Sequence, residues 1–300
     1  MEHPNSMPLD SEKLQKPLRK LRKSLKKLSP QPSPEEIHDI RTRSRQLEAI
    51  LHALMLDRNK PGQRLLGSVA PIRKRAGKLR DMDVLTGFAA RLTARGEEEC
   101  RIQLIQALGG KRLQFERKLF KAAAANGGNA RRHLKRYSTF IARRMTPKKS
   151  RTPEPNEWPG DAMAVAFQLS SELARWPALK ASNVHPWRLK VKELRYVLQL
   201  AEDSDSRFVE ALGEAKDAIG EWHDWTELEA IAKEVLDHGT GCQLVKEIHS
   251  TAQEKLDHAL AVATCLRRSW LPSSGKRGRR GPQSAAPKVP VLITTAKLAS

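Results

Sequence analysis

The sequence has few cysteines and no long apolar run, and each shortage excludes a class of protein. The three cysteines in 300 residues, Cys100, Cys242 and Cys265, show no CxxC spacing. This argues against a disulfide framework and against a zinc cluster. No apolar run approaches the roughly 20 residues of a spanning helix, and the N-terminus lacks the apolar core of a signal peptide. We therefore expect a cytoplasmic protein that does not cross a membrane and holds no metal or cofactor.

Strand patterns are missing as well. We find no Val- and Ile-rich alternation, whereas apolar residues recur at helical spacing along most of the chain. After Ser11, for example, Leu14, Leu18, Leu21 and Leu25 form one stripe. With 39% apolar residues a core can be buried, although only 5% of residues are aromatic. The sequence predicts an all-α protein.

Proline, glycine and charge divide the expected helices. They cover residues 11–28, 34–57, 63–95, 97–125, 129–145, 161–176, 185–201, 206–238 and 241–270. Ser33 is the expected N-cap of the second helix, with Pro34 at its first position. The expected domain organisation is a flexible tail (1–10), one domain (11–271) and a disordered basic tail (272–300). Within the domain we expect a first bundle (11–145), a linker (146–160) and a second bundle (161–271).

The chain is strongly basic, and the excess lies in one half. Its 55 Lys and Arg against 34 Asp and Glu give a formal net charge of +21. Residues 1–150 hold 35 basic and 14 acidic residues, whereas residues 151–300 hold 20 of each. This asymmetry favours a polyanionic partner attracted by the first half.

A short cationic motif occurs twice. His38-x-x-Arg41-x-x-x-Arg45 recurs as His185-x-x-Arg188-x-x-x-Lys192-x-x-Arg195. About forty residues later, each copy is followed by an Asp-bearing segment, KLRDMDV (78–84) and IGEWHDW (219–225). Two copies of one unit in a single chain suggest a pseudo-symmetric architecture.

The spacing places each motif on one helix face. At 100° per residue, positions 0, +3, +7 and +10 lie within about 80° of one another, and the apolar residues lie elsewhere. Like charges on one face repel, so the face needs nearby acids or an anionic ligand. Glu48, Asp81, Asp83 and Asp224 are candidate internal partners, and the histidines alone could simply pin helices together. The five cations exceed the acids in matching positions, which favours an anionic ligand.

Cations outside the two motifs are weaker indicators of a binding site. The first helix carries, beside its Leu stripe, a basic face that includes Arg19, Arg22, Lys23 and Lys26. We interpret this face as a second wall of the same groove, and the segment 131–136 as a third. A solvated face is the alternative for both, and a membrane-binding or calmodulin-like role is a further alternative for the first helix.

The two motifs and the Asp segment resemble those of the CHAD family, the conserved histidine α-helical domain. VHPWRLKVKELRY (184–196) resembles the family's second histidine signature, IHDIRTRSRQLEAIL (37–51) resembles the first, and AGKLRDMDVL (76–85) resembles its R-D-x-D element. The resemblance extends over about residues 14–270. Gln46, Glu48 and Glu193 depart from it, because the family usually has basic residues there.

The resemblance implies two pseudo-symmetric four-helix bundles with a basic central groove that binds inorganic polyphosphate. By the same resemblance, the residues expected to bind polyphosphate are His38, Arg41, Arg45, Arg80, His185, Arg188, Lys192 and Arg195. Polyphosphate granules, or enzymes of polyphosphate metabolism, are the further partners that it implies. The triphosphate tunnel enzyme to which some members are fused needs strands and an E-x-E-x-K entry, and we find neither.

We expect binding without catalysis, because the chain has no P-loop and no carboxylate cluster suited to Mg²⁺. Nucleic-acid binding through the basic half is the alternative, although only Phe88, Phe115, Phe120, Tyr137 and Phe140 could stack bases there. A phosphate enzyme with His38 or His185 as nucleophile and a structural scaffold are further alternatives. If the histidines bind the anion, affinity should rise as pH falls through the mid-6 region.

Overall fold

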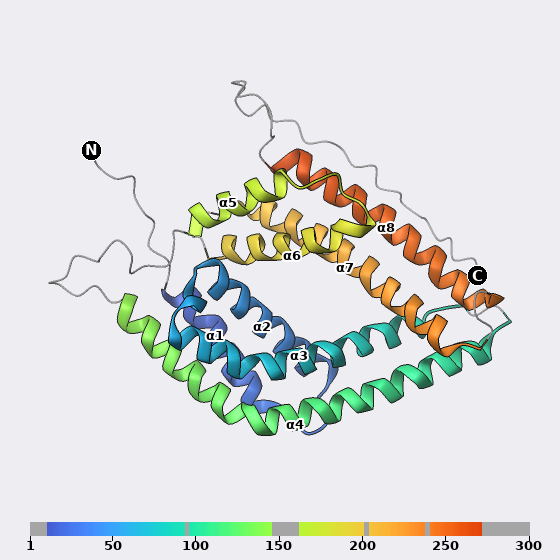
Figure 1. The fold of residues 1–300 in the computed structure, drawn as a ribbon, viewed down its shortest axis with the longest axis horizontal. Helices are drawn as coiled ribbons and strands as arrows, with labels where there is room; N and C mark the ends of the chain where they lie inside the picture. Colours follow the sequence, from blue (N-terminus) through green and yellow to red (C-terminus); the bar gives the residue numbers. More distant parts are fainter. Residues whose placement is uncertain (1–10, 94–95, 146–161, 201–203, 238–240, 272–300) are drawn as a thin grey trace, which may run out of the picture.

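A computed structural model of the protein describes residues 11–93, 96–145, 162–200, 204–237 and 241–271 (Figure 1). Its helices are α1 (Ser11–Lys27), α2 (Pro34–Ala53), the 3-10 helix η1 (Leu56–Arg58), α3 (Lys60–Ala89), α4 (Glu98–Met145), α5 (Ala162–Ala174), α6 (Ala181–Leu198), α7 (Ser206–Val235) and α8 (Gln243–Trp270). No described residue lies in a strand. The all-α prediction is therefore confirmed. The linker at 146–160 and both expected tails lie outside the described residues.

The helices of the two halves pack in a similar order. In the first half, α4 lies along α3 and α1, and α2 packs against α1 and α3. In the second half, α7 lies along α8 and packs on α6, which in turn contacts α5. The halves meet where α2 contacts α6 and where α3 and α4 contact α7 (Figure 1). The pseudo-twofold relation and the domain boundaries stay predictions.

Three apolar cores hold the helices together. The first is built from α1 to α4, and Tyr196 and Leu200 of the second half also reach it. The second is built mainly from α5 to α8 around the buried Trp187. The third draws on α3, α4, α7 and α8, for example through Leu104 and Leu228, which are both fully buried. Because this third core takes side chains from both halves, the halves share apolar burial with each other.

Local sequence signals explain the first two helices. Leu14, Leu18, Leu21 and Leu25 are all buried, as their spacing on α1 predicts. At the start of α2 the Glu36 amide donates to Ser33 Oγ at 3.3 Å, and the Ser33 amide donates to the Glu36 carboxylate at 3.0 Å. This reciprocal capping satisfies two amides that have no intrahelical acceptor. The helix ends earlier than expected, because Met55 adopts a left-handed backbone (φ 54°) before η1.

The prediction of two helices at 97–125 and 129–145 is wrong, because α4 runs unbroken through Asn126-Gly127-Gly128. Packing offsets the low helix propensity of glycine, about 1 kcal/mol per residue relative to alanine. Gly127 is buried, and the nearby Arg131 guanidinium donates to the Leu25 carbonyl of α1 at 3.3 Å. The Asn126 amide donates to the Ala122 carbonyl at 3.0 Å and so stays within the helix. In the described part of the chain no helix has both the length and the apolarity needed to cross a bilayer.

Candidate functional site

A central cavity of about 870 Å³ lies where the two halves meet, between α2, α3, α6 and α7. Of the residues that the structure describes, nine Lys and Arg residues and three carboxylates line it. The cations are Arg41, Arg45, Arg73, Lys74, Arg75, Lys78, Arg80, Arg188 and Lys192. The carboxylates are Asp81, Asp224 and Glu227, and His185 and His223 complete the titratable groups. Positive charge therefore outnumbers negative charge threefold in the lining.

Six of the eight motif residues line this cavity, and two do not. Arg41, Arg45, Arg80, His185, Arg188 and Lys192 line it. His38 is exposed one turn before Arg41, and its Nε2 lies 3.5 Å from Thr42 Oγ1. Arg195 packs against α7, where its Nε donates to the Val209 carbonyl at 3.3 Å. The helical spacing thus predicted most of the motif residues that line the cavity. Residues on the same helix face can still lie outside the cavity, as His38 and Arg195 do.

On α2, the first motif has only one cation in an ion pair with the Asp segment. Arg41 Nη2 lies 3.3 Å from Asp81 Oδ1. The Nε atoms of Arg41 and Arg45 are both buried, and neither has a hydrogen-bond partner among the described residues. Burial, followed by the charges of Arg41 and Arg73, lowers the pKa of Arg45. The cavity wall on this side therefore holds buried donors that no acceptor in the described part of the chain satisfies.

Two acids expected to neutralise the motif instead pair with other cations. The carboxylate of Asp83 lies 2.8 Å from Arg112 of α4. The carboxylate of Glu48 lies 2.9 Å from Arg73 of α3. Of the four candidate acids, Asp81 and Asp224 are the two that reach the cavity lining.

The second motif is more deeply buried. Arg188 Nε donates to the Lys216 carbonyl of α7 at 2.8 Å. This approach depends on Gly220, because a Cβ atom at that position would lie 2.4 Å from Arg188 Nη2. Asp224 is partly buried, and this burial raises the pKa of its carboxyl group, while the charge of Arg188 opposes that change. The guanidinium is thus held in place by backbone and packing as much as by charge.

Burial and neighbouring cations also shift the titration of two groups in the cavity. Burial, followed by His223, Arg188 and Lys192, lowers the pKa of His185 to about 4. The two histidine rings meet edge to face, with centroids 4.3 Å apart. Burial, followed by Arg188 and Arg45, lowers the pKa of Lys192 to about 7. The pKa of His185 in the unliganded protein therefore lies below the mid-6 region, and that of Lys192 lies close to neutral pH. The expected rise in affinity through the mid-6 region stays a prediction.

Four cations of α3 that line the cavity were not predicted from the sequence. Arg73, Lys74, Arg75 and Lys78 line the cavity ahead of the R-D-x-D element. A signal for two of them was present, because Lys74 and Lys78 precede Asp81 by seven and three positions and so share its helix face.

The basic face of α1 does not join the central cavity. Arg19, Arg22, Lys23 and Lys26 line a separate cavity of about 560 Å³ together with three cations of α4, Arg131, Arg132 and Lys135. All seven described residues that line it are Lys or Arg. We call this the α1–α4 cavity. The expectation of a second and third wall of one groove is corrected, because these residues line a second concavity.

The comparisons with known proteins agree with this architecture. The comparison with curated proteins gave no match. Among solved structures, the CHAD domain from the plant Ricinus communis is similar, with a TM-score of 0.64 and 16% identity over 89% of this chain and 96% of that one. The structure described as PptA from Streptomyces chartreusis has a TM-score of 0.58 and 14% identity, and covers 88% of this chain and 100% of that one. At these identities the likeness shows the fold.

The sequence itself matches the model of the CHAD domain over residues 12–233. The match includes both histidine motifs and both Asp segments, and it ends before α8, which the sequence analysis had included. The chain belongs to the CHAD domain family.

Proposed function

We propose that the protein binds inorganic polyphosphate in the central cavity and does not turn it over. The observation that carries this proposal is the excess of nine cations over three carboxylates in a partly buried lining. Phosphoryl oxygens accept charge-assisted hydrogen bonds from Arg and Lys, which are about twice as strong as neutral ones. A linear polyanion would supply the negative charge that the lining lacks.

The buried arginine donors of the central cavity also support the binding of a polyanion. Leaving a buried polar group without a partner costs about 1–3 kcal/mol, and more for a charged group. The Nε atoms of Arg41 and Arg45 are in this position. The pKa of Lys192, lowered to about 7, shows that further positive charge is unfavourable there before an anion binds. A bound polyanion would relieve both costs.

Polyphosphate fits the lining better than nucleic acid does. No Phe, Tyr or Trp is among the described residues that line the central cavity. Proteins that bind single strands use aromatic side chains as stacking surfaces for the bases. Polyphosphate has no bases and carries about one charge per phosphate, so the cations of the lining suffice for it.

The α1–α4 cavity would add to the binding of long chains. Its cations are mostly exposed, so a polyanion would be attracted there with little desolvation. Binding at both cavities would bring the protein to polyphosphate granules or to enzymes that act on polyphosphate.

A competition titration at about 150 mM salt would test the proposal, since surface charges are then screened within about 8 Å. Labelled long-chain polyphosphate would be displaced by short polyphosphate, single-stranded DNA or ATP. We expect short polyphosphate to compete far better than DNA. We also expect Arg45→Gln/Lys192→Met to lower the affinity about 100-fold, because it removes two charge-assisted contacts. The chain length of the polyphosphate and the release of phosphate would be followed, and both should stay constant.

A charge-matched control separates the cavity from net charge. Arg207→Gln/Lys246→Met removes the same two charges from exposed positions outside both cavities. Its affinity should stay close to that of the wild type. Equal losses in the two variants, or equal displacement by DNA, would mean that the protein attracts polyanions without a defined site.

A further inference from the structure

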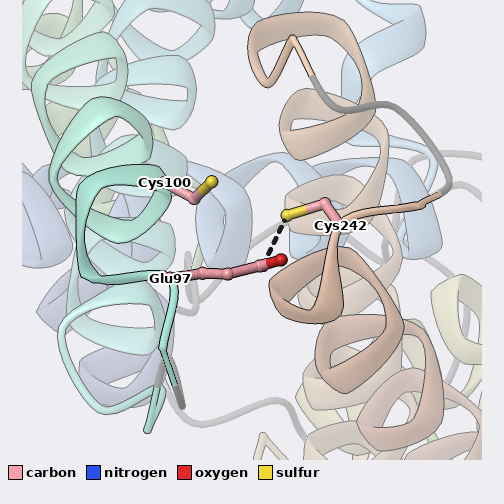
Figure 2. A group of neighbouring side chains, drawn as sticks. All are labelled: Glu97, Cys100 and Cys242. Carbon is pink, nitrogen blue, oxygen red and sulfur yellow. Dashed lines mark hydrogen bonds between the residues drawn. The ribbon is translucent and has the colours of Figure 1, made fainter.

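Two buried cysteines that are far apart in the sequence lie side by side in the structure. Cys100 is in the first turn of α4, and Cys242 is the residue that precedes α8 (Figure 2). Their exposed fractions are 5% and 1%. The carboxylate of Glu97 points at the same spot, and Cys242 Sγ donates to its Oε2 at 2.9 Å (Figure 2). The lack of CxxC spacing had argued against such a cluster, because local spacing does not register contacts between helices.

The geometry of this cluster, the Glu97–Cys100–Cys242 site, suits a tetrahedral metal ion. One ligand atom from each residue lies within 4.8 Å of the other two. Bonds of about 2.3 Å to sulfur and 2.1 Å to oxygen at tetrahedral angles would place the sulfurs about 3.8 Å apart, and each sulfur about 3.6 Å from the oxygen. Cys242 Sγ and Glu97 Oε2, now 2.9 Å apart, would separate by about 0.7 Å, and ligand atoms up to 4.8 Å apart would approach by about 1 Å; rotation of the side chains can supply both changes.

The backbone already holds Glu97 in the required position. Its Oε1 accepts the Gln243 amide at 2.9 Å, and its Oε2 accepts the Leu244 amide at 2.8 Å. These bonds cap α8 and fully account for a carboxylate at this place. They do not account for two thiols converging on it within an apolar core. A metal ion would replace the Cys242 proton at Oε2, and the backbone bonds would be kept.

Charge also favours occupation. Two thiolates and one carboxylate carry three negative charges, so a divalent cation would leave one. That remaining charge would lie beside the N-terminus of α8, where the helix dipole favours a negative group. Thiolate ligands select Zn²⁺ and similar soft metals, whereas Mg²⁺ and Ca²⁺ require oxygen ligands.

We propose that Glu97, Cys100 and Cys242 bind one thiophilic divalent cation of the Zn²⁺ type. The two thiols lose their protons to solvent, two metal–sulfur bonds and one metal–oxygen bond form, and water takes the fourth position. Water can reach this position because Glu97 is only half-buried. The site joins the start of α4 in the first half to the start of α8 in the second. None of its residues lines the central cavity, so the proposal is independent of polyphosphate binding.

Cobalt would be the probe, because thiolate-bound tetrahedral Co²⁺ absorbs in both the near ultraviolet and the visible. The reduced, chelator-treated full-length protein would be titrated with Co²⁺ and then with Zn²⁺. We expect thiolate-to-cobalt charge-transfer bands that saturate at one equivalent and are abolished by one equivalent of Zn²⁺. Cys100→Ser and Cys242→Ser should each lose these bands. The matched control is Cys265→Ser, since Cys265 is the exposed third cysteine and the change should leave the bands intact.

A second measurement keeps the test valid if a serine variant fails to fold. In the wild type, Zn²⁺ should slow alkylation of Cys100 and Cys242 at least tenfold, as read by mass spectrometry, and leave Cys265 unaffected. The absence of cobalt bands in the wild type would overturn the proposal. So would bands that survive in Cys100→Ser, or a Cys100–Cys242 disulfide that forms in air at the same rate with and without Zn²⁺.

Discussion

The two cationic cavities differ in how their charges are held. In the central cavity, Arg188 is fixed by the Lys216 carbonyl and by the close approach of Gly220, and Arg41 is paired with Asp81. The described residues that line the α1–α4 cavity are all Lys or Arg, and most of these side chains are exposed. The central cavity therefore presents several fixed, partly buried donors, whereas the α1–α4 cavity presents mainly exposed, hydrated charges.

This difference predicts two kinds of polyanion binding in one molecule. Fixed donors in a partly buried site lose little conformational entropy on binding and are screened weakly by salt. Exposed lysines and arginines act mainly through counterion release, so their contribution falls steeply as salt rises. We expect the central cavity to determine which polyanion binds, and the α1–α4 cavity to determine how strongly a long chain is attracted.

The largest expected difference between the two cavities is in how the affinity for polyphosphate depends on salt concentration. Replacing Arg19, Arg22, Lys23 and Lys26 together by Gln should lower the affinity for long-chain polyphosphate by ten- to a hundredfold at low salt and much less at high salt. The reason is that about 0.7 counterion is released for each neutralised charge of a single-stranded polyanion. The slope of log affinity against log salt should therefore fall by about 3. A titration series between about 50 and 200 mM salt measures this slope.

A charge-matched variant completes this experiment. Arg117, Lys121, Arg207 and Lys246 are exposed and line neither cavity, so replacing them by Gln should change the slope much less. A loss that is equal at every salt concentration would contradict the assignment of the α1 face to screened attraction. An equal loss with very short chains would contradict it as well.

A smaller effect is expected where the backbone of α7 approaches the second motif. In Gly220→Ala the new methyl group would meet Arg188 Nη2 at 2.4 Å, and the guanidinium would have to leave the Lys216 carbonyl. Loss of one charge-assisted contact at about 1.5 kcal/mol should weaken the binding of short polyphosphate about tenfold. Stability should change little, because alanine favours the helix by about 1 kcal/mol over glycine.

Gly213→Ala is the matched control on the same helix. Its methyl group would lie 3.4 Å from Arg195 Nε, and Arg195 does not line the central cavity. The affinity should therefore stay unchanged, and thermal unfolding of both variants would report their stability. If Gly220→Ala bound as tightly as the wild type, the position of Arg188 would not matter for binding.

Local signals in the sequence predicted much of the fold and of the central cavity. The Leu stripe of α1, the Ser33 cap and the separation of a cationic face from an apolar face all follow from residues within a few turns of one another. These signals, with the repeat, were enough to place Arg41, Arg45, Arg188 and Lys192 on cavity-facing helices. They failed at Asn126–Gly128, where packing of α4 against α1 offsets the glycines.

What the sequence could not predict depends on contacts between distant segments. The separation of the α1 face from the central cavity depends on α1 packing against α4. The convergence of Cys100 and Cys242 depends on where α4 and α8 begin relative to each other. The low pKa of His185 depends on burial and on the neighbouring His223 of α7. The residue pattern of α6 alone does not predict this contact.

The last expected effect is a pH dependence that only the central cavity should show. Burial and nearby cations hold the pKa of Lys192 at about 7, below its ordinary 10.5. A bound polyanion favours the charged amine and so raises this pKa. Affinity should then rise as pH falls from about 9 toward 7, by at most about tenfold per pH unit for one proton taken up. Below pH 7 this contribution is complete, because the amine is already protonated before binding.

Titrations at several pH values above neutral isolate this group, since terminal phosphates with a second pKa of about 6 are then already ionised. The burial-lowered pKa of His185, about 4, keeps that imidazole neutral over the same range before binding. Lys192→Met should therefore bind more weakly near pH 7 but show a flat profile, and the four-residue α1 variant should keep the wild-type profile. An unchanged slope in Lys192→Met would show that the proton is taken up elsewhere. The distinction between buried and exposed cations would then no longer explain how the two cavities differ.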